Sequence, residues 1–376
     1  LLLFNRKKIN PKENNYIKLL FTNIIIESYL LQLITISRPH FSEGFSKLKE
    51  LADSLSIYLN KRIDKLVSRQ ILKIVKAYNL QKNLPKADYD NIFFNIGSCY
   101  QSAKKYKLAI EYYNSANKSE KSNKYNYKIL ECLYLKKDKK KFLNFSKKIK
   151  KVKKIDFNSL AVCNYASKQF KTKNFYSFCE EPINNVVKYD LIKKNIIQTK
   201  LLKQIDKDIS TNRNHVNTPK VIGFKSLGNL YDINSKSIKK CKKIINNCIF
   251  DYKKNFLERN SVLIKNWPKK FYINAWYIKI KKGGEILPHI HDGWLSGVFY
   301  IKKIKNKKLP LSNEGELEVN YQFSNLKELR KNIYRKIIFV KEGDLVLFPS
   351  SLPHRVIPYK NNKERLSIAF DMKPLR

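Results

Sequence analysis

Cysteine, proline and glycine are scarce in this chain of 376 residues. The six cysteines form no C-x-x-C pair and no compact framework, which argues against a zinc site or a set of disulfides. Isolated thiols of this kind are typical of the reducing cytoplasm, so we expect a cytoplasmic protein. Apolar residues still make up 43% of the sequence, which excludes a disordered composition and allows a proper core.

Long uninterrupted apolar runs are also missing. A membrane-spanning helix needs about 20 mostly apolar residues. The stretch 17–36 is rich in Leu and Ile, but Asn23, Glu27, Ser28 and Gln32 interrupt it. We therefore interpret it as a buried or amphipathic helix and expect no membrane span.

Acidic residues are few, with 31 Asp and Glu against 77 Lys and Arg, and the net charge is +46. Taken alone, such a charge suggests a polyanionic partner. The lysines, however, are spread along the whole chain, and they accompany many Asn, Ile and Tyr residues, whose codons are also AT-rich. Genome composition explains this pattern without selection for binding, so we expect no specific nucleic-acid partner.

The first half of the chain has the periodicity of stacked helices. Its apolar residues recur every three or four positions, and one segment matches the tetratricopeptide pattern. The matching residues are Phe93, Ile96, Gly97, Tyr100, Ala109, Tyr113 and Ala116. Small residues at 97 and 109 allow two helices to cross closely. About 34 residues later, Tyr127, Leu130 and Tyr134 continue the pattern, which then decays. This predicts one regular and one degenerate repeat; the alternative is a generic helical bundle.

From Phe271 onward, the alternation of apolar and polar residues becomes typical of strands, and Gly- and Asn-containing turns separate them. One helix is predicted before this region, at Ser235–Leu257. The predicted strands are Phe271–Lys281, Leu295–Lys302, Gly315–Phe323, Lys336–Val340, Asp344–Phe348, Arg355–Tyr359 and Arg365–Asp371. Short strands at this spacing indicate a jelly-roll barrel.

These patterns predict an α+β multidomain protein. We expect a tetratricopeptide-like α-helical repeat domain over residues 1–190 and a double-stranded β-helix (jelly-roll) domain over residues 219–376. A linker over residues 191–218 is expected between them, because the helical pattern fades before it and the stretch is rich in Lys and Asn.

Histidine is scarce too, yet three of the five histidines lie in the predicted β region: His289, His291 and His354. His289 and His291 are two residues apart, so their side chains share a face on a strand. Neutral imidazole is the commonest metal ligand among side chains. His354 follows a strand end, where ligands at a barrel mouth converge. The three residues therefore predict a metal site.

Arg365 follows His354 by eleven residues, and Ser367 comes two positions later. We expect one hairpin to bring the strands of His354 and Arg365 side by side. The guanidinium fork pairs with a carboxylate in bidentate fashion, and the Ser367 hydroxyl adds a hydrogen bond. A dicarboxylate would then meet the metal at one end and Arg365 at the other. Tyr300, on a neighbouring strand, either contacts this ligand or fills the interior.

The ordered set of His-x-His, distal His and Arg-x-Ser resembles the 2-oxoglutarate/Fe(II) dioxygenase superfamily. The similar segments are Pro288–Gly297, Gly343–His354 and Arg365–Asp371. The sequence is most similar to a family of such oxygenases that follow tetratricopeptide repeats in marine bacteria. This resemblance implies an enzyme that binds Fe(II) and 2-oxoglutarate, converts 2-oxoglutarate to succinate and hydroxylates an unactivated C–H bond. Arg365, Ser367 and Tyr300 would bind 2-oxoglutarate.

The chain departs from the superfamily pattern at the second metal ligand, where His291 replaces the usual carboxylate and Asp292 follows it. Three ligand sets stay open. We favour three histidines, then His289 and His354 alone with water, as in the similar aspartyl/asparaginyl β-hydroxylases, then these two with Asp292.

The helical repeats suggest a peptide or protein partner, because such arrays present concave binding surfaces; a small metabolite is the rival. Trp276 and Trp294 would line a substrate pocket or belong to the core. The alternative function is a non-catalytic, cupin-like metal-binding module or repeat scaffold.

Overall fold

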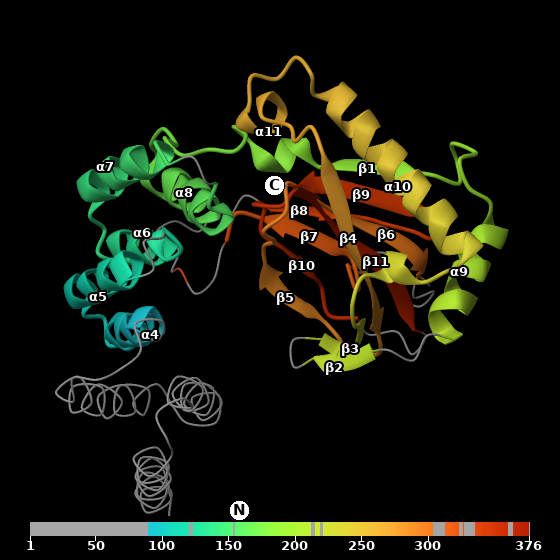
Figure 1. Ribbon diagram of the computed structural model, residues 1–376, viewed down its shortest axis with the longest axis horizontal. Coiled ribbons are helices and arrows are strands. Elements are labelled where there is room, and N and C mark those ends of the chain that lie inside the picture. The colour runs from blue at the N-terminus through green and yellow to red at the C-terminus, as the bar shows by residue number, and fades with distance from the viewer. Residues whose placement is uncertain are drawn as a thin grey trace, which may run out of the picture. The chain divides into compact units, whose positions relative to one another are not determined.

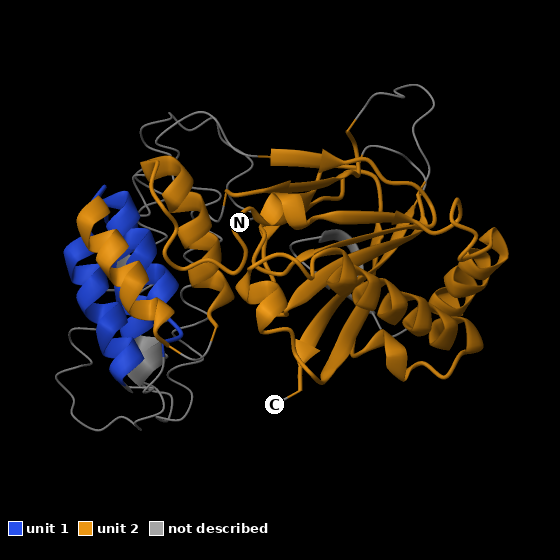
Figure 2. Ribbon diagram, turned by 90° about the horizontal axis from the view of Figure 1, so that it is seen from above, with its two compact units in different colours: residues 1–138 blue, residues 139–376 orange. Residues whose placement is uncertain are grey.

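The computed structural model describes residues 89–119, 123–152, 155–211, 215–218, 221–303, 313–322, 326, 335–359 and 364–375. The chain divides into two compact units, residues 1–138 and 139–376 (Figure 2). The helix expected at residues 17–36 lies outside the described residues. No helix in the described segments is long and apolar enough to cross a membrane.

Unit 1 contains the helices α4 (Tyr89–Ser102), α5 (Tyr106–Ser119) and α6 (Asn126–Leu135). Helices α4 and α5 pack closely because Gly97 faces the ring of Tyr113. A Cβ atom at Gly97 would lie 2.7 Å from that ring. The Tyr113 side chain is fully buried, and its hydroxyl donates a hydrogen bond of 2.7 Å to the Gln101 side chain. The predicted helical pair is thus confirmed.

Unit 2 begins with further helices, whose ends are fixed by local hydrogen bonds. Asp156 caps α8 by accepting hydrogen bonds from two backbone amides, and Ser235 caps α10 in the same way. The helix predicted at Ser235–Leu257 is therefore confirmed. The helices are α7 (Lys139–Lys150), α8 (Phe157–Phe170), α9 (Thr199–Thr211), α10 (Lys236–Asn255) and α11 (Val262–Lys265), with short 3-10 turns at Pro182–Asn185 and Leu230–Asp232.

The rest of unit 2 is an antiparallel sheet of eleven strands in the described residues (Figure 1). The strands are β1 (Val187–Asp190), β2 (His215–Thr218), β3 (Val221–Ser226), β4 (Phe271–Ile280), β5 (Ile286–His289), β6 (Leu295–Lys302), β7 (Leu317–Asn320), β8 (Arg335–Ile338), β9 (Asp344–Pro349), β10 (His354–Val356) and β11 (Arg365–Pro374). Their order is β1-β9-β6-β11-β4-β3-β5-β10-β7-β8, and β2 pairs with β3.

The sheet folds back so that its two halves face each other. One buried cluster joins Trp276 and Ile278 of β4 and Ala369 of β11 to Val356 of β10, which lies well away from them in the strand order. On the outside, α9 packs on β6 and α10 packs on α9 (Figure 1). This two-layered antiparallel domain is the arrangement predicted for a double-stranded β-helix.

Each of the seven predicted strands is present in the structure. Four strands were missed: β1, β2, β3 and β5. Three of them are only four residues long, too short to show a clear alternation. Residues 191–218, expected to form a linker, contain α9 and β2.

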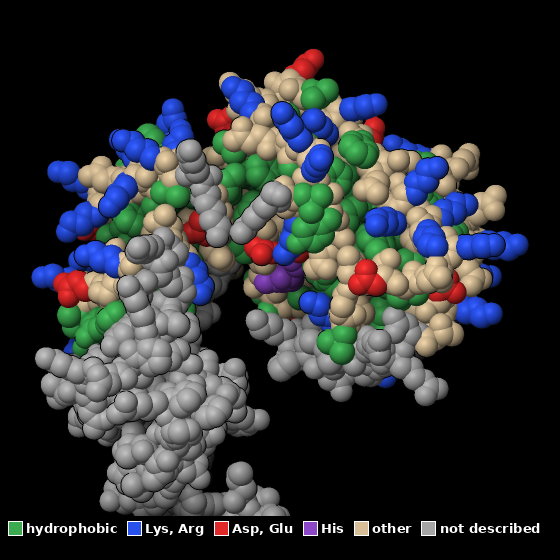
Figure 3. All heavy atoms as spheres, viewed as in Figure 1, with side chains coloured by type: hydrophobic (Ala, Val, Ile, Leu, Met, Phe, Trp, Pro, Cys, Tyr) green, Lys and Arg blue, Asp and Glu red, His purple; other side chains and the backbone are tan. Residues whose placement is uncertain are grey.

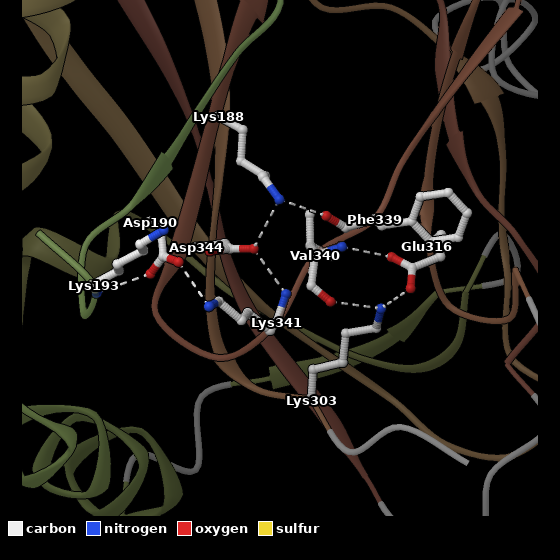
Figure 4. Close-up of polar contacts among 9 residues, drawn as sticks. All are labelled: Lys188, Asp190, Lys193, Lys303, Glu316, Phe339, Val340, Lys341 and Asp344. Atoms are coloured by element: carbon white, nitrogen blue, oxygen red, sulfur yellow. Dashed lines mark hydrogen bonds and ion pairs between the residues drawn. The ribbon is translucent and has the colours of Figure 1, made fainter. Parts of the chain in front are cut away.

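Charged side chains join the outer strand β1 to the turn before β9 (Figure 4). Lys341 pairs with Asp190 at 2.7 Å, and Lys188 donates to the carbonyl of Phe339 at 3.0 Å. Beside them Lys303 and Glu316 form an ion pair, and both side chains are almost fully buried. The contacts of Lys188 and Asp190 fasten β1, which precedes the predicted β domain, to the main sheet.

Candidate metal and cosubstrate site

A cavity of about 490 Å³ lies between the two halves of the folded sheet. It contains the three predicted histidines together with Arg365, Ser367 and Tyr300. Most other lining residues are apolar, and none of the described lining residues is acidic. Histidine side chains are visible from outside on the face drawn in Figure 3. The sequence therefore identified polar groups that the fold gathers in one space.

The three histidines converge on one point. Each offers a ring nitrogen, and these atoms all lie within 4.8 Å of one another. His289, at the end of β5, is the direct cross-strand partner of His354 on β10, and their ring centroids are 4.3 Å apart. His291 follows β5, with its ring 4.9 Å from His289 and 5.1 Å from His354. This spacing suits three nitrogen ligands on a single metal ion.

Hydrogen bonds at Nδ1 make Nε2 the nitrogen of these rings that would bind a metal ion. His289 Nδ1 lies 2.8 Å from the carbonyl oxygen of Leu287, and His354 Nδ1 lies 3.1 Å from that of Leu352. A carbonyl oxygen only accepts, so Nδ1 carries the proton and Nε2 keeps its lone pair. Burial, together with the neighbouring His289 and His291, lowers the pKa of His354 well below its ordinary value. The ring is therefore neutral, as a metal ligand must be.

Asp292, the third-ranked candidate, lies outside this group. Its side chain is 81% exposed and pairs with Lys373 at 2.7 Å. His291 instead turns inward, and its Nδ1 lies 3.0 Å from Oδ2 of Asp371. The arrangement favours the three-histidine set.

Arg365 is a buried cation in the same cavity. Its side chain is only 1% exposed, and its Nη1 donates to Ser367 Oγ at 3.2 Å. Its Nε and Nη2 atoms have no hydrogen-bond partner among the described residues. A buried guanidinium without an anion is strongly unfavourable. A ligand carboxylate would supply the missing acceptors, so the residues fit a dicarboxylate such as 2-oxoglutarate.

Tyr300 lies beside this guanidinium, with its ring centroid 5.0 Å from the central carbon of Arg365. Its hydroxyl is buried and has no partner among the described residues. Burial raises the pKa of Tyr300 to about 12, and the nearby Arg365 offsets only part of this effect. The hydroxyl is therefore a neutral donor. Because Tyr300 and Ser367 are cross-strand partners, both can reach the same ligand carboxylate.

The expectation that the strands of His354 and Arg365 lie side by side is wrong. Strand β11, with Arg365, pairs with β4 and β6, whereas β10, with His354, pairs with β5 and β7. The two residues therefore face the cavity from opposite halves of the sheet. Because β10 and β11 are not paired with each other, there is space for a ligand between the metal position and the guanidinium.

Two further residues belong to the site and were missed: Asp371, which contacts His291, and Ser296, which contacts Asp371. The signal for Asp371 was its place in the alternation of β11, where Arg365 and Ser367 face the cavity. Trp276 lines the cavity, with its ring 5.5 Å from that of His291. Trp294 belongs to the core, where its indole N–H donates to the carbonyl of Leu263 at 2.9 Å.

Comparisons with known proteins agree with this geometry. Residues 274–371 match the family model described as "Putative 2OG-Fe(II) oxygenase", a segment that contains the three histidines and Arg365. No curated protein matches the chain. The C-terminal domain is therefore a 2-oxoglutarate- and Fe(II)-dependent oxygenase domain. It is an oxidoreductase, and its cofactors are iron and 2-oxoglutarate.

Solved structures similar to this chain have low sequence identity to it. A prolyl-4-hydroxylase from Pseudomonas putida has a TM-score of 0.35 and 12% identity, over 51% of this chain and 94% of that one. HygX from Streptomyces hygroscopicus, with nickel and 2-oxoglutarate bound, has a TM-score of 0.35 and 13% identity, over 50% of this chain and 83% of that one. The nogalamycin epimerase SnoN has a TM-score of 0.36 and 8% identity, over 50% and 78%.

Proposed function

We propose that this protein is a hydroxylase in which His289, His291 and His354 hold Fe(II) and Arg365 anchors 2-oxoglutarate. The observation that carries this assignment is a single cavity with three convergent imidazoles and a buried guanidinium that has two unpartnered nitrogens. Ser367 and Tyr300 would complete the carboxylate pocket, because both lie beside Arg365.

When bound, iron and 2-oxoglutarate would use molecular oxygen to hydroxylate a C–H bond, with release of succinate and carbon dioxide. The protein's own residues bind, orient and exclude water. Arg365, Ser367 and Tyr300 would donate hydrogen bonds to one carboxylate of the cosubstrate. The apolar walls, including Ile278, Val298 and Phe348, keep bulk water away from the reacting groups.

The substrate in this proposal is a peptide or protein side chain, and a small metabolite is the rival. The paired helices α4 and α5 support a peptide partner, because their close packing at Gly97 and Tyr113 is that expected for a tetratricopeptide unit. We further propose that this pair is such a repeat, and that the protein is of the marine-bacterial type in which repeats precede the oxygenase. The five buried free cysteines of the described residues support a cytoplasmic location.

The test is turnover of 2-oxoglutarate to succinate by the purified full chain with Fe(II) and oxygen, with and without candidate peptides. Wild type should form succinate. His354→Ala should lose both turnover and Fe(II) binding, whereas the matched change Asp292→Asn, at an exposed residue beside the site, should keep both. Stoichiometric Fe(II) binding without any turnover of 2-oxoglutarate would favour the non-catalytic metal-binding module instead.

A further inference from the structure

The carboxylate of Asp371 is held rigidly against one of the three histidines. Its side chain is 3% exposed, and its Oδ2 lies 3.0 Å from His291 Nδ1. Its Oδ1 accepts a hydrogen bond of 2.7 Å from the hydroxyl of Ser296. Asp371 and Ser296 are register partners on β11 and β6, and Ser296 also contacts Ser350 at 2.7 Å. The carboxylate is therefore held between β6 and the segment that follows β5.

Among the three histidines, His291 is the one whose Nδ1 meets a carboxylate; the other two meet backbone carbonyl oxygens. A carboxylate is the stronger acceptor, because the hydrogen bond is charge-assisted. It polarises the imidazole further and makes its other nitrogen a better electron donor to a metal. His291 therefore has an outer partner of a different kind from those of His289 and His354.

His291 also needs this contact for its orientation. It lies beyond the end of β5, so strand pairing does not hold its backbone in place. Its backbone N–H does donate a hydrogen bond of 3.1 Å to the carbonyl oxygen of Ser350. The chain then passes directly over Asp371 at Gly293. A Cβ atom at Gly293 would lie 3.0 Å from the Cβ of Asp371, which is tighter than ordinary contact. The glycine lets the segment approach closely enough for the His291–Asp371 hydrogen bond.

The charge of the site points to the same residue. In the superfamily pattern that this chain resembles, the position of His291 holds a carboxylate that binds the metal directly. Three neutral imidazoles bring no negative charge to Fe(II), and Asp292 is engaged with Lys373 on the exposed side. Asp371 places one buried negative charge a single hydrogen bond away from the ligand set.

We propose that Asp371 is a positioning residue that acts on the metal through His291, orienting its ring and supplying from outside the ligand set the charge that a direct carboxylate ligand would provide. The inference rests on the three-histidine site proposed above.

The test is a titration of the full-length protein with Co(II) alone, which needs neither oxygen nor substrate. Asp371→Asn preserves the shape of the side chain and removes its charge, and Asp371→Ala removes the hydrogen bond as well. We expect both variants to bind Co(II) about 10- to 100-fold more weakly than wild type, the usual effect of losing an outer partner of a ligand. Asp292→Asn, the same change one residue from His291, should bind as tightly as wild type.

A double-mutant cycle separates positioning from general damage. If Asp371 acts through His291, Asp371→Asn should weaken Co(II) binding no further in a His291→Ala background. In proton spectra of the Co(II) protein, the Nδ1–H signal of His291 should be lost or exchange rapidly with solvent in Asp371→Ala, while those of His289 and His354 persist.

The outcomes are distinct. Wild-type affinity in Asp371→Asn, or an equal loss with and without His291, overturns the positioning role while leaving the metal site in place. Failure of wild type itself to bind Co(II) overturns the proposed metal site, and this inference with it. Thermal unfolding of the metal-free proteins verifies that each variant is folded.

Discussion

Replacing Arg365 by methionine should weaken the binding of 2-oxoglutarate without destabilising the fold. The guanidinium binds the cosubstrate, but its burial without an anion disfavours folding. The charge is buried; among the described residues its guanidinium donates a hydrogen bond to Ser367 at 3.2 Å and lies 5.0 Å from the Tyr300 ring. These contribute about 1 kcal/mol and at most about 2 kcal/mol. Burial of an unpaired charge costs several kcal/mol, so its removal should leave the ligand-free protein at least as stable.

Binding should change in the opposite direction. Losing one partner of a buried ion pair costs about 3–5 kcal/mol, or roughly a 160- to 4,600-fold loss of affinity for 2-oxoglutarate. At a concentration 100 times its Kd, 2-oxoglutarate stabilises wild type by about 2.7 kcal/mol. At the same concentration, a variant at least 100-fold weaker should gain at most about 0.4 kcal/mol.

The assay is thermal unfolding with and without 2-oxoglutarate, in the presence of Fe(II) and without oxygen, supported by calorimetric titration. Arg355→Met is the matched control, because Arg355 forms a bidentate pair with Glu318 at 2.8 and 3.0 Å outside the cavity. That variant should lose some stability and keep the affinity of wild type for 2-oxoglutarate. If Arg365→Met instead binds 2-oxoglutarate as wild type does, the cosubstrate pocket is wrongly assigned.

Three further predictions concern stability. Gly97→Ala places a methyl group 2.7 Å from the Tyr113 ring and should lower the free energy of unfolding of the helical unit by about 1–3 kcal/mol, as followed by circular dichroism; an equal or higher midpoint would contradict the close helix packing. Lys303→Met leaves Glu316 buried without its cation and should cost about 3–5 kcal/mol in urea unfolding, whereas a double variant with Glu316→Gln should recover much of the loss. Burial raises the pKa of Glu318, but hydrogen bonds from its arginine and asparagine neighbours outweigh this, so the pKa lies below its ordinary value. Because this pKa is lower in the folded state, the ionised carboxylate stabilises the fold above the unfolded-state pKa of about 4.3, and this stabilisation is lost as the pH falls. Glu318→Gln should therefore be less stable than wild type at pH 7 and nearly equal to it in acid. A constant difference across the pH range would refute the role of this charge.

Local pattern predicted much of the fold. The strands β4, β6 and β11 have eight to ten residues each, long enough for a strand pattern to show, and α10 has both a capping serine and an apolar face, so each was found from the sequence. The metal-ligand candidates were found for a similar reason. Histidine is rare here, and the spacing of His289 and His291 places both side chains on one side wherever the local backbone is extended.

Short strands and pairings between distant segments could not be predicted in this way. Strand β1 has four residues and is recognisable only by its pairing with β9, more than 150 positions later. The expected hairpin between the strands of His354 and Arg365 was wrong for the same reason, because spacing along the chain does not show which strands share hydrogen bonds.

The sequence by itself therefore determined the elements with a strong period and pointed to the three histidines and Arg365 as candidate site residues, because those features depend on residue type and local spacing. The tertiary structure decided that β10 and β11 face each other across a cavity, and that Asp371 contacts His291 from 80 positions away. The physical reason is that strand pairing and the closure of a folded sheet depend on the packing of the whole domain. No stretch of a few residues carries that information.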